Sequence, residues 1–262
     1  MKKWMLLILI PALAWSCSEE PKPEEKPAPP KKKVVQPKPK PKPKPKKPRG
    51  WINNGNVVER LTQYGKENPE TIVDIYTTFG KVRVRLYKDT PLHRASFLLW
   101  AKKGFYNGSV FMRVAPDFIA QGGATHTDEQ QAIKREIGKY TIPPEFHKHH
   151  FHKKGALGAA RHYKDNPEKR SDSHRFYFVE GTRYNEPTLA KYEETNGYKY
   201  TKTQRDYYLG ENQGAAHIDG QHTVFGEIIS GYSVVPKLTH VETDSKDWPI
   251  DDLFIDSVKV IR

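Results

Sequence analysis

The hydrophobic and polar positions along the chain become periodic at residues 72–87. Residues 72–77 and 81–87 are predicted strands, joined by a turn at 78–80. In the second strand, apolar residues occupy every other position and arginines lie between them. This period-two pattern is typical of a strand with one face in water. The two segments therefore predict a hairpin that opens a β-sheet.

A helix is predicted directly after this hairpin. Thr90 is placed to act as its N-cap, Pro91 occupies the first helical position, and Gly104 ends it. Between them, leucine, alanine, phenylalanine and tryptophan recur at helical spacing, so one side of the helix is apolar. A shorter helix is predicted over residues 54–63, ahead of the sheet.

An apolar stretch over residues 111–123 contains a single arginine, Arg113. Its β-branched and aromatic residues suit a half-buried sheet, and Gly122 and Gly123 are predicted to end it with a bend. A guanidinium among apolar residues needs acceptors for its five donors, or it costs free energy. Arg113 is therefore expected either to pair with an internal carboxylate or to point into a pocket for a ligand, and both alternatives stay open.

The remaining periodic segments complete a mainly β fold. Many short strands with two separated helices predict a closed antiparallel β-barrel, capped by two helices and interrupted by a helical insertion. Pro236 falls about one turn into the last predicted helix, where it would cost a hydrogen bond unless the helix starts late. The segments are the strands 155–161, 222–228 and 253–261 and the helices 187–195, 201–209 and 232–239.

The N-terminal sixteen residues have the pattern of a secretory signal peptide. Lys2 and Lys3 precede an apolar run that is shorter than the about 20 residues of a membrane-spanning helix. The segment that ends in Cys17 resembles the lipobox of bacterial lipoproteins, and Cys17 is the single cysteine of the chain. We expect lipidation of Cys17 and a lipid-anchored protein of the cell envelope, on the periplasmic face or at the surface of the outer membrane. The alternative is an ordinary signal peptide with an incidental cysteine.

Residues 17–50 are predicted to be a linker rather than part of a packed domain. Residues 21–49 contain eleven prolines, and Lys and Pro alternate in their second half. Such a chain favours extended polyproline II at about 3.1 Å per residue. A spacer that holds the folded domain away from a membrane and a cationic arm that binds anionic polymer or lipid headgroups are both consistent with it.

The net charge of +13 is concentrated in this linker. Residues 21–50 carry eleven Lys and one Arg against two Glu, whereas the rest of the chain is close to neutral. The folded part therefore has no electrostatic pattern that indicates nucleic-acid binding.

Four histidines, at positions 147, 149, 150 and 152, raise the question of a metal site. Glu145 is the only carboxylate near them in the sequence, and the spacing is not that of two ligands one helical turn apart. The segment is interpreted as an exposed polar loop, and no metal site is predicted.

Four blocks in a fixed order resemble the cyclophilin family of peptidyl-prolyl cis-trans isomerases. They are FYNGSVFMRVAPDFIAQGG at 105–123, GALGAAR at 155–161, RFYFV at 175–179 and HIDGQHTVFGEI at 217–228. The resemblance covers roughly residues 70–262. It implies a cyclophilin-like barrel domain, preceded by a short segment at 51–69. An insertion at about 180–216 is of the kind seen in related bacterial lipoproteins.

The resemblance also implies roles for individual residues and no cofactor or metal. Arg113 matches the catalytic arginine that donates toward the proline nitrogen, and Gln121 matches the glutamine that supports it. The matching substrate-binding positions are Phe118, Ile119, Tyr177 and Ile218 in the proline pocket, Ala160 and Arg161 along the peptide backbone, His222 at the rim, and Arg175 and His217 beside the groove.

Several positions depart from the family pattern without removing the arginine or the pocket. Met112 replaces a histidine, Arg161 an asparagine, Arg175 a glutamine, and His217 the tryptophan that many members use to bind cyclosporin. Isomerase activity is expected, and the added arginines suggest a preference for acidic peptides.

The sequence therefore predicts a monomeric isomerase that binds proline-containing peptides of unfolded exported proteins. A low-turnover binding module or holdase is one alternative. A second alternative is a structural adaptor, in which the Lys–Pro arm binds the partner and the folded domain has no activity of its own.

Overall fold

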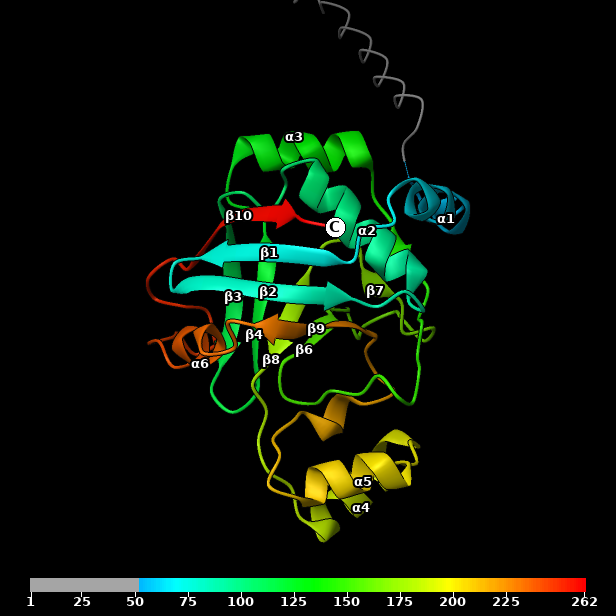
Figure 1. The fold of residues 1–262 in the computed structure, drawn as a ribbon, viewed down its shortest axis with the longest axis vertical. Coiled ribbons are helices and arrows are strands. Elements are labelled where there is room, and N and C mark those ends of the chain that lie inside the picture. Colours follow the sequence, from blue (N-terminus) through cyan, green and yellow to red (C-terminus); the bar gives the residue numbers. More distant parts are fainter. Residues whose placement is uncertain (1–51) are drawn as a thin grey trace, which may run out of the picture. The chain divides into compact units, whose positions relative to one another are not determined.

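The computed structural model describes residues 52–262, and their main β-sheet closes into a barrel (Figure 1). Among these residues, eight antiparallel strands pair in the order β1-β10-β3-β4-β8-β6-β9-β2, and β5 and β7 form a separate two-stranded sheet. The mainly β, closed-barrel prediction is confirmed. The strands are β1 Ile72–Thr77, β2 Gly80–Leu86, β3 Ser109–Ala115, β4 Ile119–Ala124, β5 Thr141–Ile142, β6 Ala156–Ala159, β7 Ser171–Asp172, β8 Phe176–Val179, β9 Val224–Ser230 and β10 Phe254–Val260.

Besides the two helices predicted to cap the barrel, the described residues contain three other predicted helices and α3, which was not predicted. In the described part of the chain they are α1 Val57–Glu67, α2 Pro91–Lys102, α3 Asp128–Ile137, α4 Glu186–Asn196, α5 Lys202–Leu209 and α6 Val234–Thr239, with a 3₁₀ turn at Ala216–Ile218. Helices α2 and α6 add Phe97, Trp100, Val235 and Leu238 to the core that fills the barrel. In Figure 1, α3 lies above the barrel and the α4–α5 insertion below it.

Helix α3 was not predicted because it buries little apolar surface. Its buried residues are Gln130 and Ile137. The helix starts instead with a capping box, in which the Thr127 hydroxyl accepts from the Gln130 N–H and the Gln130 side chain accepts from the Thr127 N–H. That T-x-x-Q pattern was the signal available in the sequence.

The start of α2 is capped from a distant segment rather than by Thr90. The Thr90 side chain makes no capping bond. The Glu145 carboxylate accepts from the N–H groups of Leu92 and His93, both at 2.9 Å, and from the His93 ring at 2.6 Å. A carboxylate at a helix N-terminus satisfies free donors and complements the helix dipole. Glu145 therefore ties the segment before β6 to the beginning of α2.

Two local predictions about glycine and proline have different outcomes. Gly122 and Gly123 do not end a strand, because β4 continues through both to Ala124. At Gly123, φ is +89° and a Cβ would lie 2.7 Å from a backbone oxygen of His174, so glycine is required there for close packing. Helix α6 was predicted to begin at Tyr232 but begins at Val234, and this later start places Pro236 in its first turn, where no helical donor is lost.

The insertion forms a small tyrosine-rich core together with Phe151 from the segment before β6. Its two helices lie close to the predicted ranges 187–195 and 201–209, and Gly197, which ends α4, adopts the left-handed conformation with φ +61°. The buried members of this core are Phe151, Leu189, Tyr200, Tyr208 and Ala216. Within residues 52–262, no helix has the length and apolar character needed to cross a bilayer.

Candidate functional site

A β-bulge aims Arg113 at the outer face of the barrel. Phe111 pairs with Gly122, but Arg113 pairs with Gln121, so two steps along β3 match one step along β4. Without the extra residue Arg113 would share the inward side of the buried Phe111. The bulge places it beside Gln121, which in turn pairs with Tyr177 on β8. Three residues that the sequence assigned to one site thus lie in a row across three strands.

Arg113 has a carboxylate partner, but this partner lies at the surface. Its Nε donates to Oδ2 of Asp247 at 3.0 Å, and the two side chains are 43% and 42% exposed. Of the two alternatives left open by the sequence, the structure shows the pairing with a carboxylate of the protein itself, in an ion pair that is exposed rather than buried. An exposed ion pair contributes about 0–1 kcal/mol. Because the bond uses Nε, it leaves Nη1 and Nη2 to other acceptors.

Asp247 was missed by sequence reasoning because it lies in a short loop far along the chain. Its backbone has φ +62°, and its carbonyl oxygen accepts from the Val114 N–H at 2.9 Å. The Asp244 carboxylate shapes this loop by accepting from the N–H groups of Lys246 and Trp248. The loop is thus attached to β3 next to the arginine, and the Asp247 carboxylate faces Arg113.

Phe118 is fixed by the turn between β3 and β4. Glu180 Oε2 accepts from the Asp117 N–H at 3.1 Å, and the Phe118 carbonyl accepts from the N–H groups of Glu180 and Gly181. The Phe118 ring lies 5.4 Å from the Arg113 guanidinium carbon and 4.7 Å from the His217 ring. An apolar ring, a guanidinium and an imidazole therefore meet at one place on the surface.

Five of the predicted pocket residues lie in one apolar cluster, separate from the barrel core. Both main-chain groups of Ala160 are used within the protein, since its N–H donates to Arg175 and its carbonyl accepts from Asp172. Of the two residues that were predicted to contact the peptide backbone, Arg161 is therefore the one expected to do so. The cluster contains Ile119, Ala156, Ala160, Tyr177, Val179, Ala215, Ile218 and Val224, with Phe118 and Tyr87 at its edge.

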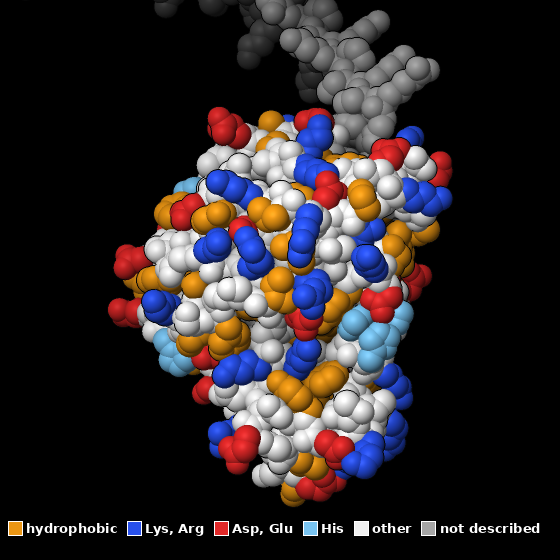
Figure 2. All heavy atoms as spheres, viewed as in Figure 1, with side chains coloured by type: hydrophobic (Ala, Val, Ile, Leu, Met, Phe, Trp, Pro, Cys, Tyr) orange, Lys and Arg blue, Asp and Glu red, His pale blue; other side chains and the backbone are white. Residues whose placement is uncertain are grey.

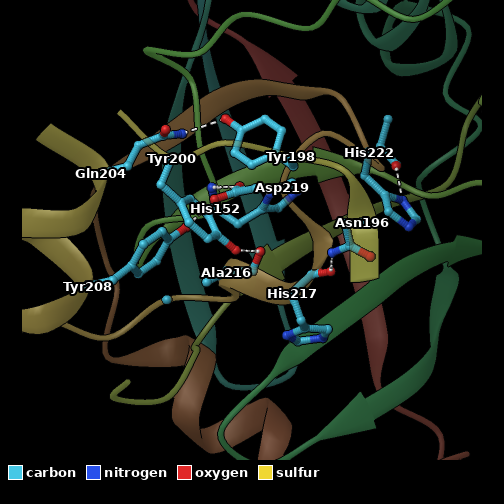
Figure 3. Close-up of polar contacts among 12 residues, drawn as sticks. His152, Asn196, Tyr198, Tyr200, Gln204, Tyr208, Ala216, His217, Asp219 and His222 are labelled. Carbon is cyan, nitrogen blue, oxygen red and sulfur yellow. Dashed lines mark hydrogen bonds and ion pairs between the residues drawn. The ribbon is translucent and has the colours of Figure 1, made fainter. Parts of the chain in front are cut away.

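Tyr177 lies at the bottom of this cluster and is held by a buried hydrogen-bond chain. Its hydroxyl is 2.8 Å from Nε2 of His152, whose Nδ1 donates to Asp219 at 2.6 Å. Asp219 also accepts from the Tyr208 hydroxyl on α5 at 2.7 Å (Figure 3). Burial raises the pKa of Tyr177 well above its ordinary value, so the hydroxyl stays protonated and donates to Nε2. Its ring crosses Gly158, where a Cβ would lie 2.3 Å away.

The prediction of an exposed polar loop is wrong for His152. Its side chain is 1% exposed, and that of Asp219 is 2% exposed. The sequence does not reveal this role, because Asp219 lies 67 residues away. A buried carboxylate needs such partners to offset its lost hydration.

The insertion supports the turn that carries His217 and Ile218. Asn196 donates to the His217 carbonyl and Tyr200 to the Ala216 carbonyl, both at 2.8 Å (Figure 3). Burial lowers the pKa of His217, which favours the neutral imidazole beside Phe118. The sequence left open whether the insertion covers one end of the binding groove or supports the barrel. In the structure it contacts the turn that contributes Ile218 to the apolar cluster.

His222 belongs to a polar rim that includes a residue the sequence did not single out. Its Nδ1 donates to the Ala159 carbonyl at 3.1 Å, and Nε2 accepts from the Tyr163 hydroxyl at 2.8 Å. The Arg161 guanidinium lies 4.1 Å from the Tyr163 ring. Burial lowers the pKa of His222 to about 3, and His152 adds to this shift, so the imidazole is neutral near pH 7.

The carbonyl of Arg175 accepts from Ala160 of this cluster, but its side chain lines a neighbouring groove of about 520 Å³. Its Nε is 3.7 Å from the Asp172 carboxylate, and Trp100 contributes an apolar wall. Lys134, Arg135 and Lys139 add positive charge to the same groove. The geometry therefore assigns Arg175 to a basic groove rather than to the apolar pocket.

The family model, the relatives and the solved structure that match this chain are all peptidyl-prolyl cis-trans isomerases by name. Residues 72–260 match the family model "Cyclophilin type peptidyl-prolyl cis-trans isomerase/CLD". Schizosaccharomyces pombe peptidyl-prolyl cis-trans isomerase ppi1 is 28% identical over 184 residues, 70% of this chain and 94% of that protein. A Streptococcus pyogenes protein, whose name gives it a phosphatase and a peptidyl-prolyl cis-trans isomerase activity, is 32% identical over 191 residues. That match covers 72% of this chain, which spans only 38% of the streptococcal protein.

The fold is also that of a solved cyclophilin. The crystal structure of a Cryptosporidium parvum cyclophilin-type isomerase, obtained in the presence of the dipeptide Ala-Pro, superposes with a TM-score of 0.51. The match covers 73% of this chain and 99% of that one, at 18% sequence identity.

The hydrogen-bond chain below the cluster gives a stability prediction. Tyr177→Phe keeps the ring but leaves Nε2 of His152 buried without a partner, which should lower the free energy of unfolding by about 1–3 kcal/mol. Urea unfolding measures this loss. Tyr163→Phe is the matched control and should change stability by less than about 0.5 kcal/mol, because its hydroxyl lies at the surface. Equal effects of the two variants would contradict the role assigned to the Tyr177 hydroxyl.

Proposed function

Because the chain belongs to the cyclophilin-type peptidyl-prolyl cis-trans isomerases, we propose that Arg113 is its catalytic residue and that unfolded exported proteins are its substrates. The observation that carries the assignment is the bulge in β3, which turns Arg113 away from the core and toward Gln121 and Phe118. The proline ring of a bound peptide would lie on the apolar cluster of Phe118, Ile119, Tyr177 and Ile218.

The reaction requires a twisted amide to be bound better than either planar form. Resonance in the peptide bond creates a barrier of about 18–20 kcal/mol, and twisting returns the lone pair to the proline nitrogen. A 10⁵-fold acceleration corresponds to about 7 kcal/mol of preferential binding. A charged donor aimed at that nitrogen supplies part of this, and removal of water from the peptide supplies more.

Each part of the candidate site has a task in this scheme. A nitrogen of the Arg113 guanidinium donates to the proline nitrogen as the amide twists, while Asp247 holds Nε and thereby orients the group. Gln121 is the register partner of Arg113 on β4, and we infer that it supports the guanidinium. Neutral His217 and His222 add no positive charge that would compete for the substrate.

The alternative is a proline-peptide binding module with little turnover, and the ion pair between Arg113 and Asp247 is the observation in its favour. A guanidinium kept on a carboxylate would donate poorly to a nitrogen. Turnover by the unmodified chain and its variants distinguishes the two.

Substitution of Arg113 tests the catalytic assignment. In a protease-coupled assay of a proline peptide, Arg113→Ala should lower kcat/KM by about 10²–10³-fold, as loss of one charged donor does in other preorganised sites. Arg85→Ala, at an exposed arginine of β2 that pairs with Glu227, is the matched control and should leave kcat/KM unchanged. Wild-type turnover no faster than that of Arg113→Ala would favour the binding module.

Arg161, at the rim with Tyr163 and His222, and the neighbouring basic groove that Arg175 lines support a preference for acidic peptides. We expect a higher kcat/KM for proline peptides with Glu near the proline than for the same peptides with Lys. Arg161→Ala and Arg175→Ala should each reduce that ratio by up to about fivefold, the range for exposed charge pairs. The ratio should fall with salt, because exposed charges are screened. Equal rates for both peptides in the wild type would rule the preference out.

The location of the enzyme is proposed from its N-terminal sequence, which lies outside the described residues. We propose that residues 1–16 are removed as a signal peptide, that Cys17 carries the lipid, and that residues 17–50 hold a monomeric isomerase domain off the membrane. The Lys–Pro composition and the single cysteine support this.

Metabolic labelling with a fatty-acid precursor tests the anchor. The wild-type chain should incorporate label and sediment with membranes, whereas Cys17→Ser should lose the label and become soluble. Protease treatment of whole cells then distinguishes surface from periplasmic attachment. Label retained by Cys17→Ser would overturn the assignment.

A further inference from the structure

Three histidines and an aspartate that have no assigned part in the isomerase reaction gather at the surface. Figure 2 shows histidine side chains together at the right of the molecule, between barrel and insertion. His147, His149 and His150 come from the segment before β6, and Asp89 comes from the connection between β2 and α2. From this arrangement, we propose that Asp89, His149 and His150 form a binding site for a zinc-class divalent transition-metal ion.

The donor atoms already converge on one point. Nε2 of His149 is 2.9 Å from Oδ2 of Asp89, and Nε2 of His150 is 2.8 Å from Oδ1. One ligand atom from each residue lies within 4.8 Å of the others. Ligands about 2.0–2.1 Å from a tetrahedral zinc ion are separated by about 3.3 Å. Small side-chain movements would therefore suffice to admit the ion.

The surrounding contacts hold these ligands in place. The His150 ring stacks on Tyr87 with centroids 3.8 Å apart, and its side chain is only 13% exposed. His147 donates from Nε2 to the Asp89 carbonyl at 2.8 Å. Glu145 belongs to the segment before β6 and caps α2, which begins shortly after Asp89. It therefore links the same two chain segments at a second point. Such outer contacts orient metal ligands and improve affinity.

The donor set selects the class of ion. Two neutral imidazoles and one carboxylate suit zinc and its neighbours, and a fourth position stays available to water. Magnesium and calcium prefer oxygen donors and would bind weakly here. The set also carries one negative charge, which favours a divalent cation.

A bound ion would stabilise the attachment between barrel and insertion. It would link Asp89 to the segment that continues into Phe151 and His152. Phe151 packs against Tyr207 and Tyr208 of α5, and His152 holds Tyr177 and Asp219. Metal binding is therefore expected to raise the melting temperature without supplying a group to the reaction.

Calorimetric titration of the full chain with Zn²⁺ tests the site. Every protein carries Cys17→Ser, so that the only thiol of the chain cannot bind the ion. One equivalent should bind with a micromolar or lower Kd, and Mg²⁺ should not compete. Asp89→Asn, His149→Ala and His150→Ala should each weaken binding at least tenfold. His126→Ala, at an exposed histidine outside the cluster, is the matched control and should bind as the parent does.

Two further measurements separate this site from the isomerase. Arg113→Ala should bind Zn²⁺ like the parent, and isomerase activity of the parent should be the same in excess EDTA. Circular dichroism of the metal-free variants shows that each is folded. The proposal is overturned if the parent binds no more tightly than the His149→Ala variant, or if His126→Ala weakens binding equally.

Discussion

The buried carboxylate of Asp219 is the constraint on which most of the candidate site depends. It accepts from the backbone N–H and the ring of His152, and from the hydroxyl of Tyr208. A carboxylate shielded from water is tolerated only with such partners. Because His152 in turn binds Tyr177, one charge joins the floor of the apolar cluster, the segment before β6 and the insertion. The insertion is thus part of the architecture of the site rather than an appendage.

A second constraint is the register of β3 against β4. One extra residue at the bulge decides whether Arg113 faces the core or the solvent, and the loop that carries Asp247 then meets it there. Because the chain belongs to the cyclophilin-type isomerases, the chemistry expected of this barrel is peptidyl-prolyl isomerisation. In this chain the arginine is also balanced by an exposed carboxylate, so its freedom to reach a substrate depends on a weak surface ion pair.

Elements with strong local signals were predictable, and those stabilised from elsewhere were not. The hairpin β1–β2 followed from the alternation of apolar residues with arginines, and α4 and α5 lie close to the helices predicted at 187–195 and 201–209. Helix α3 has little apolar surface to reveal it. The cap of α2 comes from Glu145 rather than Thr90, because a carboxylate brought by the fold satisfies the same N–H groups more strongly than a hydroxyl.

The sequence by itself determined the barrel, the order of its family motifs and the residue types that could form a proline pocket, because periodicity and short motifs are local properties. Only the tertiary structure decided which side chains meet. Asp247 beside Arg113, Asp219 beside His152, Tyr163 beside His222 and Asp89 beside His149 and His150 are contacts between segments far apart in the chain. No spacing rule encodes such contacts, since they arise from barrel closure and from the packing of the insertion.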